Sequence, residues 1–112
     1  MEYIPDRGDV VWLNFTPQAG REQAGHRPAL VLSPKEYNRK TGLAVMCPMT
    51  TQTKGYPFEV AITTGSVQGV VLSDHLKNLD WRERKVTYKG KASSSVLKEV
   101  MNKISALLMI EQ

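Results

Sequence analysis

Short runs of apolar residues, separated by glycine, proline and polar residues, occupy most of the chain up to Lys91. In residues 9–15, β-branched and aromatic side chains alternate between two faces, which is the two-residue period of a β-strand. Other apolar runs have the length and composition of strands as well. We therefore predict strands over residues 9–15, 28–33, 43–49, 58–62, 70–76 and 85–88.

The polar segments between these runs predict turns and one short helix. Residues 16–25 and 50–57 contain too much glycine, proline and hydroxyl side chain for regular structure, so we expect loops there. Ser33 and Pro34 suit the start of a helical turn, and Gly42 suits its end. Two glycines, Gly65 and Gly69, are expected to bracket a turn.

Residues 93–112 follow a different period. Three serines at 93–95 can cap a helix, and the apolar positions after them recur about every 3.6 residues up to Leu108. This predicts one amphipathic helix of about four turns. Together these patterns predict a mainly β (α+β) fold, with a small antiparallel barrel-like sheet, short helical insertions and a C-terminal helix.

Length and composition agree with one globular domain spanning residues 1–112. The chain has 112 residues, of which 41% are hydrophobic and 23% are charged. Its apolar runs are strand-sized, and its N-terminus lacks the pattern of a signal peptide, so we expect a cytoplasmic protein without a membrane anchor. Cys47 is the single cysteine, so an intrachain disulfide is impossible, and its apolar neighbours predict a small buried side chain.

Positive charge is concentrated in one part of the chain. The net charge is +4, and residues 77–91 carry six basic residues against two acidic ones. Trp81 and Tyr88 are interleaved with these charges, as in proteins that bind nucleic acids. A solvated face explains the same pattern equally well.

The segment from Glu22 to Pro28 places an acid and a permanent cation next to a strand. Pro28 favours an extended backbone at Arg27, and a bend at Gly25 would bring Glu22 back towards the guanidinium. If the neighbouring strand ends meet, Thr50 joins them. RNA cleavage by a ribose 2′-hydroxyl requires a base, a charge that stabilises the phosphorane and an acid for the departing 5′-oxygen. Glu22 suits the first role, Arg27 could fill the second and the third, and Thr50 could donate a hydrogen bond to a phosphate oxygen. A surface salt bridge is the commoner explanation for the pair Glu22 and Arg27 taken alone.

Other polar residues leave alternatives open. The two histidines, His26 and His75, could divide acid and base work or simply bond to neighbours. Lys54 could contact a phosphate or remain solvated. The carboxylates are scattered, and no His-x-x-His or Cys-x-x-Cys spacing occurs, so we predict no metal and no cofactor.

Several longer blocks of the sequence closely resemble the MazF/PemK toxin family of bacterial toxin–antitoxin systems. The resemblance is dense from Pro5 to Val60 and thinner through Arg84. It is carried by Pro5-Asp6-x-Gly8-Asp9, Trp12-x-x-Phe15, residues 22–29 (EQAGHRPA), residues 31–34 (VLSP), Tyr37-Asn38-x-Lys40-Thr41-Gly42, residues 48–60 around Thr50-Thr51-Gln52-x-Lys54-Gly55, Gly69-Val70-x-Leu72-x-Asp74, Lys77 and Trp81-Arg82-x-Arg84.

The resemblance implies an SH3-like barrel that forms a homodimer and acts as a metal-independent, sequence-specific endoribonuclease. Such enzymes cut single-stranded mRNA at short, ACA-like sites, leave 2′,3′-cyclic phosphate and 5′-hydroxyl ends, and so inhibit translation and growth. The family's catalytic residues fall on Arg27, Thr50 and Glu22, the last as base or substrate positioner. Its RNA-binding positions are expected at Phe15, Gln23, His26, Lys54, Asp74, His75, Lys77 and Arg84.

The same resemblance implies an antitoxin partner of the MazE kind, whose acidic, partly disordered tail would occupy the basic RNA groove. His75 stands where the family often has glutamine, and an imidazole presents different donors and acceptors, so the recognised triplet stays open. Two alternatives are a CcdB-like toxin that binds gyrase through its C-terminal helix and a non-catalytic RNA-binding barrel. The tail from Ser105 to Gln112 lacks the terminal Trp-Gly-Ile of gyrase poisons.

Overall fold

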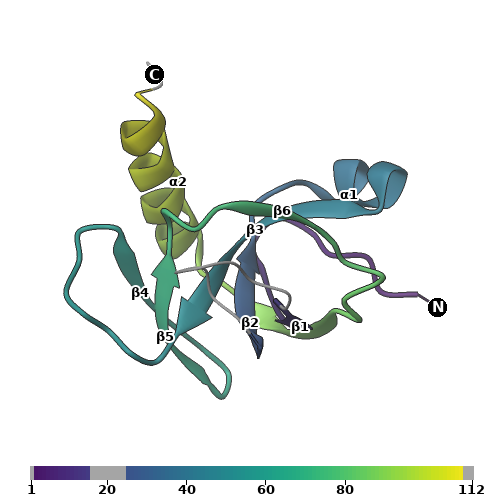
Figure 1. Ribbon diagram of the computed structural model, residues 1–112, viewed down its shortest axis with the longest axis horizontal. Helices are drawn as coiled ribbons and strands as arrows, with labels where there is room; N and C mark the ends of the chain where they lie inside the picture. The colour runs from purple at the N-terminus through teal and green to yellow at the C-terminus, as the bar shows by residue number, and fades with distance from the viewer. Residues whose placement is uncertain (1, 16–24, 110–112) are drawn as a thin grey trace.

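The computed structural model describes residues 2–15 and 25–109, which form a curled antiparallel sheet with two helices (Figure 1). The mainly β fold class predicted from the sequence is confirmed. In chain order the elements are β1 (Asp9–Asn14), β2 (His26–Val31), α1 (Lys35–Thr41), β3 (Leu43–Thr50), β4 (Glu59–Thr64), β5 (Val67–Leu72), β6 (Lys77–Asp80), β7 (Thr87–Lys91) and α2 (Ser94–Leu108).

Strand β3 is the centre of the sheet because it pairs with three different strands along its length. Its first half pairs with β6, residues 46–48 pair with β2, and residues 49–50 pair with β5. The main order of strands is β4-β5-β3-β2-β1-β7. Because β3 has successive partners along its length, the sheet curls, and β2 and β3 lie side by side at its centre (Figure 1).

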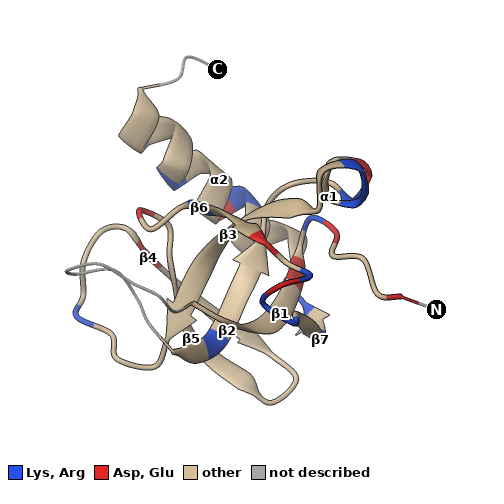
Figure 2. Cartoon of the chain, turned by 45° about the vertical axis from the view of Figure 1, so that its right-hand side comes forward, with Lys and Arg blue, Asp and Glu red and all other residues tan. Residues whose placement is uncertain are grey.

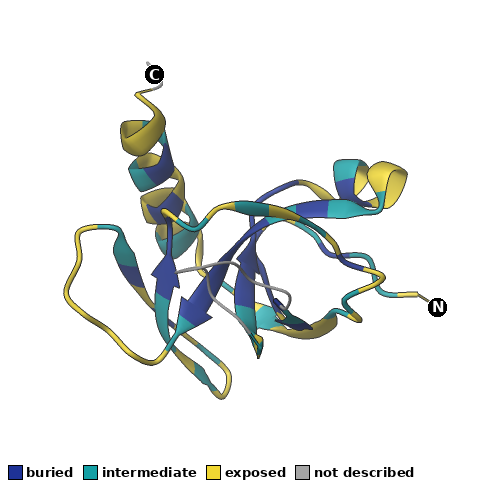
Figure 3. Cartoon of the chain, in the orientation of Figure 1, coloured by how far each residue is buried: buried dark blue, intermediate teal, exposed yellow. Residues whose placement is uncertain are grey.

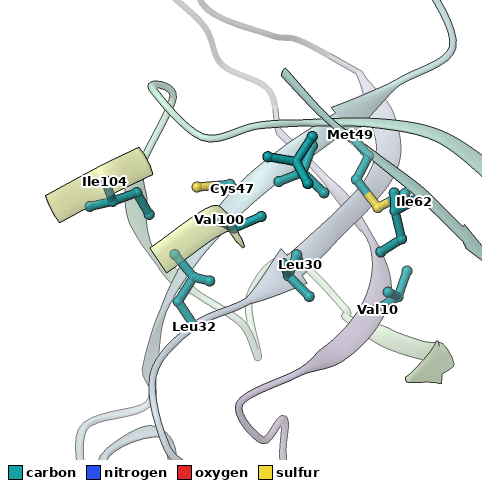
Figure 4. Packing of buried hydrophobic residues seen from close by; sticks show 10 residues of the cluster. Val10, Leu30, Leu32, Cys47, Met49, Ile62, Val100 and Ile104 are labelled. Carbon is teal, nitrogen blue, oxygen red and sulfur yellow. The ribbon is translucent and has the colours of Figure 1, made fainter. Parts of the chain in front are cut away.

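Successive residues of β1 point to opposite faces of the sheet, and both faces carry buried side chains there. Val10 packs in a cluster that α2 covers with Val100 and Ile104, whereas Val11 faces a second cluster closed by Trp81. Figure 3 shows the buried positions continuing through the centre of the sheet, and Figure 4 shows the α2 side chains seated on the first cluster. Cys47 is fully buried in that cluster, as predicted.

The helix ends follow the sequence signals. The hydroxyl of Ser93 accepts a hydrogen bond from the backbone N–H of Val96 at 3.2 Å, which caps α2. Helix α1 ends at Gly42, whose φ of 73° is the left-handed conformation that glycine adopts without strain. Within the described residues, neither helix has the length and apolar character needed to span a bilayer.

Strand boundaries differ from the prediction in the second half of the chain. Strand β5 begins at Val67 and ends at Leu72, because the chain turns at Ser73 and the N–H of His75 bonds back to the carbonyl of Leu72 at 3.0 Å. The prediction of a strand over 70–76 was therefore wrong at both ends, and Gly69 lies within the strand. The sequence did not predict β6, which is short and exposes alternate residues.

Candidate functional site

A cleft of about 570 Å³ lies where β2 begins and β3 ends. Its walls come from β1, β2, the end of β3, the loop between β3 and β4, and the turn after β5. The predicted site residues that line it are Arg27, Thr50, His26, Lys54, Asp74 and His75. Glu22 and Gln23, which were predicted as a catalytic and an RNA-binding residue, lie outside the described residues.

The register of the sheet explains why Arg27 and Thr50 share this cleft. Strands β2 and β3 pair antiparallel, with Ala29 opposite Pro48. Arg27 precedes Ala29 by two residues and Thr50 follows Pro48 by two, so both lie just beyond this pairing, and both line the cleft. Both side chains are partly buried. Residues 23 positions apart in sequence are thus brought to one cleft by the antiparallel arrangement of the two strands.

The Thr50 hydroxyl is oriented by its own loop. Its oxygen accepts a hydrogen bond from the backbone N–H of Gln52 at 3.1 Å, which leaves the hydroxyl proton to be donated elsewhere. The backbone of Thr50 is held from the other side by β5, where it pairs with Val70. That approach requires glycine at position 69, because a Cβ there would lie 2.5 Å from the carbonyl oxygen of Thr50.

The loop between β3 and β4, which carries Lys54, is held by a single carboxylate. Glu59 accepts hydrogen bonds from the Thr53 hydroxyl at 2.7 Å, from the Lys54 N–H at 2.9 Å and from the Gly55 N–H at 3.0 Å. These bonds, with that from Thr53 the largest, lower the pKa of Glu59 below its ordinary value. Glu59 was not predicted as a site residue, because two of its three donors are backbone N–H groups, which every sequence offers.

The turn after β5 forms the opposite wall. The Ser73 N–H and hydroxyl both donate to the carbonyl of Phe58, at 3.2 and 2.5 Å. This fixes the two following side chains at the cleft, where Nε2 of His75 lies 3.9 Å from Oδ1 of Asp74. Both are partly exposed, and so they are accessible to a ligand.

Trp12 also lines the cleft and was not predicted as a site residue. Its side chain is 38% exposed, and its ring stacks on that of His26 with 6.3 Å between centroids and 22° between planes. Trp12 lies on the same face of β1 as Val10. Val10 belongs to the cluster that α2 covers, whereas Trp12, two residues further along the strand, does not.

Three predicted RNA-binding residues lie outside this cleft. Arg84 donates from Nη1 to the carbonyl of Asn14 at 2.9 Å and lines a second recess, of about 540 Å³, together with His26. Lys77 belongs to β6, opposite Met46. Phe15 is 2% exposed within the second core cluster, so the structure gives its ring a packing position rather than the RNA-contacting one that was predicted.

Part of the basic segment 77–91 is occupied by structural contacts. Nζ of Lys91 lies 2.9 Å from Oδ1 of Asp9, and this hydrogen bond raises the pKa of Lys91. Arg82 pairs with Glu2 at 3.2 Å and lies 4.6 Å above the ring of Trp81. Figure 2 shows basic positions also at the start of β2 and in the β3–β4 loop, both of which contribute residues to the cleft. Among residues 2–15 and 25–109, no three potential metal-ligating side chains gather in one place.

Comparisons with known proteins agree over almost the whole chain. A family model described as PemK-like, MazF-like toxin of type II toxin–antitoxin system matches residues 6–108. The Endoribonuclease toxin MazF of Escherichia coli (strain K12) is 49% identical over 106 residues, covering 95% of this chain and 96% of that protein. The crystal structure of MazF (Form-I) from Deinococcus radiodurans has a TM-score of 0.94 at 55% identity, covering 97% and 100% of the two chains. The MazE–MazF (Form-II) structure from the same organism has a TM-score of 0.87 at 48% identity, covering 98% and 100%.

Proposed function

The chain belongs to the PemK-like, MazF-like toxin family, and from this we propose that it is the toxin of a toxin–antitoxin system and acts as an endoribonuclease. Its substrate is single-stranded mRNA in the cytoplasm, cut without a metal ion at short, ACA-like sites. Cleavage leaves 2′,3′-cyclic phosphate and 5′-hydroxyl ends and inhibits translation and growth. The observation that carries this proposal is the meeting of Arg27 and Thr50, from two different strands, in one cleft.

The chemistry follows from the groups that the cleft offers. The ribose 2′-oxygen loses its proton to a base and bonds to phosphorus, and the bond from phosphorus to the 5′-oxygen breaks as that oxygen takes a proton. In this proposal the permanent charge of Arg27 stabilises the phosphorane, and Arg27 is also the candidate donor of that proton. The Thr50 hydroxyl donates a hydrogen bond to a phosphate oxygen, because its own oxygen already accepts from Gln52. Glu22 is the proposed base or substrate positioner.

RNA contacts are proposed for the other residues of the cleft. Lys54 offers a cation to the phosphate backbone, and His26, Asp74 and His75 offer donors and acceptors to base edges. Gln23 is proposed with them on the family resemblance. Lys77 and Arg84 would act outside the main cleft, Arg84 through the second recess.

A homodimer and an antitoxin complete the proposal. Solved structures of relatives include MazE–MazF complexes from Deinococcus radiodurans. We propose that this chain also binds a MazE-like antitoxin, whose acidic tail would compete with RNA for the cleft.

The first experiment measures cleavage of a long, defined single-stranded RNA in excess EDTA, with both fragment ends mapped. We expect cleavage at a recurring triplet, with cyclic phosphate and 5′-hydroxyl ends. Products with 3′-hydroxyl ends, or complete loss of cleavage on chelation, would contradict the mechanism. Binding without cleavage would favour a non-catalytic RNA-binding barrel, and gyrase inhibition without either would favour a CcdB-like toxin.

Thr50 supplies a matched pair of variants for the same assay. Thr50→Val keeps the shape of the side chain but removes the donor, and we expect cleavage to fall about 100- to 1,000-fold, as when one hydrogen bond to a developing oxyanion is lost. Thr50→Ser keeps the hydroxyl and should retain most of the rate. Arg27→Ala should abolish measurable cleavage while the protein stays folded by circular dichroism. Equal rates for the valine and serine variants would remove Thr50 from the chemistry.

A further inference from the structure

The cleft and the second recess share one residue, His26, which lines both. The cleft is about 570 Å³ and the recess about 540 Å³, and they lie on either side of the point where β1 ends and β2 begins. An extended ligand leaving the cleft towards the recess therefore passes over the rings at this point. Those rings are the stacked pair Trp12 and His26.

Trp12 contrasts with the other tryptophan of the chain. Trp81 is 2% exposed, belongs to the second core cluster and donates from its indole nitrogen to the carbonyl of Asn38 at 3.0 Å. Trp12 is 38% exposed and lies in neither core cluster. A large aromatic surface exposed beside basic groups is the kind of surface on which single-stranded nucleic acids stack their bases.

Side chains alternate between the two faces of a strand, and this places the aromatic pair on a different face from Arg27 and Thr50, the proposed catalytic pair. On β1 and β2, Trp12 and His26 point to one face of the sheet, whereas Arg27 points to the other. By the register of β2 and β3, Thr50 lies on the same face as Arg27. The cleft contains residues of both faces, so it runs around the end of the strand pair.

A nucleotide fits this division, because its phosphate and its base project from opposite sides of the sugar. We propose that Trp12, supported by His26, is a stacking platform for the base of a nucleotide adjoining the cleaved phosphate. The phosphate lies against Arg27 and Thr50 while the base lies on the indole. This inference rests on the proposed ribonuclease function and adds to it a base-binding subsite that precedes the second recess.

The test uses an oligonucleotide of the cleaved sequence made with 2′-deoxy sugars, which cannot undergo attack by a 2′-hydroxyl. Its affinity is measured by fluorescence anisotropy for the unaltered protein and for Trp12→Ala and Trp12→Phe. Loss of one stacked base should weaken binding about five- to 150-fold in Trp12→Ala. Trp12→Phe, which keeps an aromatic face, should recover most of the affinity. Tyr88→Ala removes another exposed aromatic, 52% exposed and outside the cleft, and should bind as the unaltered protein does.

Abasic substitutions, made one position at a time in the same oligonucleotide, identify the stacked base. At one position the abasic change and Trp12→Ala should not add, because each removes the same contact. The stacking platform would be overturned if the losses of affinity from the abasic change and from Trp12→Ala were additive at every position, or if Trp12→Ala bound with unchanged affinity. Neither result would affect the proposed cleavage by the unaltered protein. If Trp12→Ala weakens only the binding of an acidic antitoxin peptide, the surface recognises protein instead. If the unaltered protein neither binds nor cuts RNA, the ribonuclease proposal and this inference both fail.

Discussion

The position of Thr50 depends on Gly69, a residue that has no side chain and takes no part in the proposed chemistry. Gly69 lets β5 approach so closely that a methyl group in its place would meet the Thr50 carbonyl oxygen at 2.5 Å and its carbonyl carbon at 3.1 Å. Both atoms are backbone, so neither can rotate away. The position of the proposed catalytic hydroxyl is thus set by the absence of a side chain on the neighbouring strand.

We predict that Gly69→Ala lowers the free energy of unfolding by about 1–3 kcal/mol, the usual cost of overpacking, and slows RNA cleavage. Thermal unfolding and single-turnover rates measure the two effects. Gly90→Ala is the matched control, because its Cβ would meet only the side chain of Thr64, with Oγ1 at 2.8 Å, away from the cleft. If cleavage by Gly69→Ala stays at the level of the control, the strand contact does not position Thr50.

At the residue scale, the roles of Arg27 and Thr50 stay predictions, whereas the local structure around several predicted residues differs from what the sequence pattern indicated. Arg27 was expected just before a strand, but it lies within β2 and pairs with Leu13. The pairing continues through Pro28, since β3 joins β2 only over residues 29–31 and the missing N–H is tolerated there. Alternation tells which residues share a face but not how far neighbouring elements cover that face, so it does not show that Phe15 is buried and Trp12 is exposed.

Among the elements, the loop between β3 and β4 is the segment whose shape most directly controls the cleft. It presents Lys54 and Tyr56 to the cavity, and Glu59 at the start of β4 holds its backbone. Gly55, with a φ of 74°, supplies the left-handed turn that brings the N–H groups towards the carboxylate. Glu59 is therefore a positioning residue that acts through the loop.

We predict that Glu59→Gln raises KM for RNA about three- to tenfold and changes kcat by less than about twofold, because the amide replaces one acceptor oxygen with a donor. Tryptic cleavage after Lys54 in the folded protein should accelerate in parallel. Thr53→Val, which removes one of the three bonds, should have a smaller effect in both assays. An unchanged tryptic rate in Glu59→Gln would show that the carboxylate does not hold the loop.

The pKa of Glu59 gives this element a pH dependence of known sign. Because hydrogen bonding lowers that pKa in the folded protein, the stabilisation is complete above the ordinary glutamate pKa. It is lost as the pH falls through the lowered value, when protonation removes acceptor capacity. The loop should therefore be fully ordered at neutral pH, and the amide resonances of Lys54 and Gly55 should shift together only in acid.

Element boundaries were predictable where a regular apolar repeat ends at a capping or turn residue. Helix α2 has both a serine cap and a regular apolar repeat, and it was placed correctly. Strand β6 has four residues, and its pairing with β3 depends on a partner distant in sequence, which no local pattern records. The shift of β5 has a similar cause, since Gly69 is selected by its contact with β3 and not by a turn.

On the scale of the whole molecule, the outer half of α2 carries apolar side chains that the described chain leaves uncovered. Figure 1 shows this end of the helix standing clear of the sheet, and Figure 3 shows it exposed. Met101, Leu107, Leu108 and Met109 are 37%, 43%, 55% and 88% exposed, respectively. We propose that this patch contributes to the contact between two copies of the chain.

We predict that the purified protein sediments with twice the chain mass of 12.6 kDa, and that Leu108→Glu shifts it towards the monomer. Asn102→Glu adds the same charge to a polar position of the helix and should leave the mass unchanged. Analytical ultracentrifugation over a range of protein concentrations measures the shift. A protein that is monomeric before any substitution, or a Leu108→Glu variant that remains fully dimeric, would exclude this patch from the dimer contact.

The core encloses the thiol of Cys47 and so protects it from reagents in solution. Cys47 is the single cysteine of the chain, it is fully enclosed, and burial raises its pKa to about 12, so at neutral pH it offers almost no thiolate to an electrophile. A cysteine introduced on the surface would therefore be the sole rapidly labelled position. Maleimide dyes could be attached to α2 or to the β3–β4 loop without first removing a native thiol, and the motion of either element could then be followed directly.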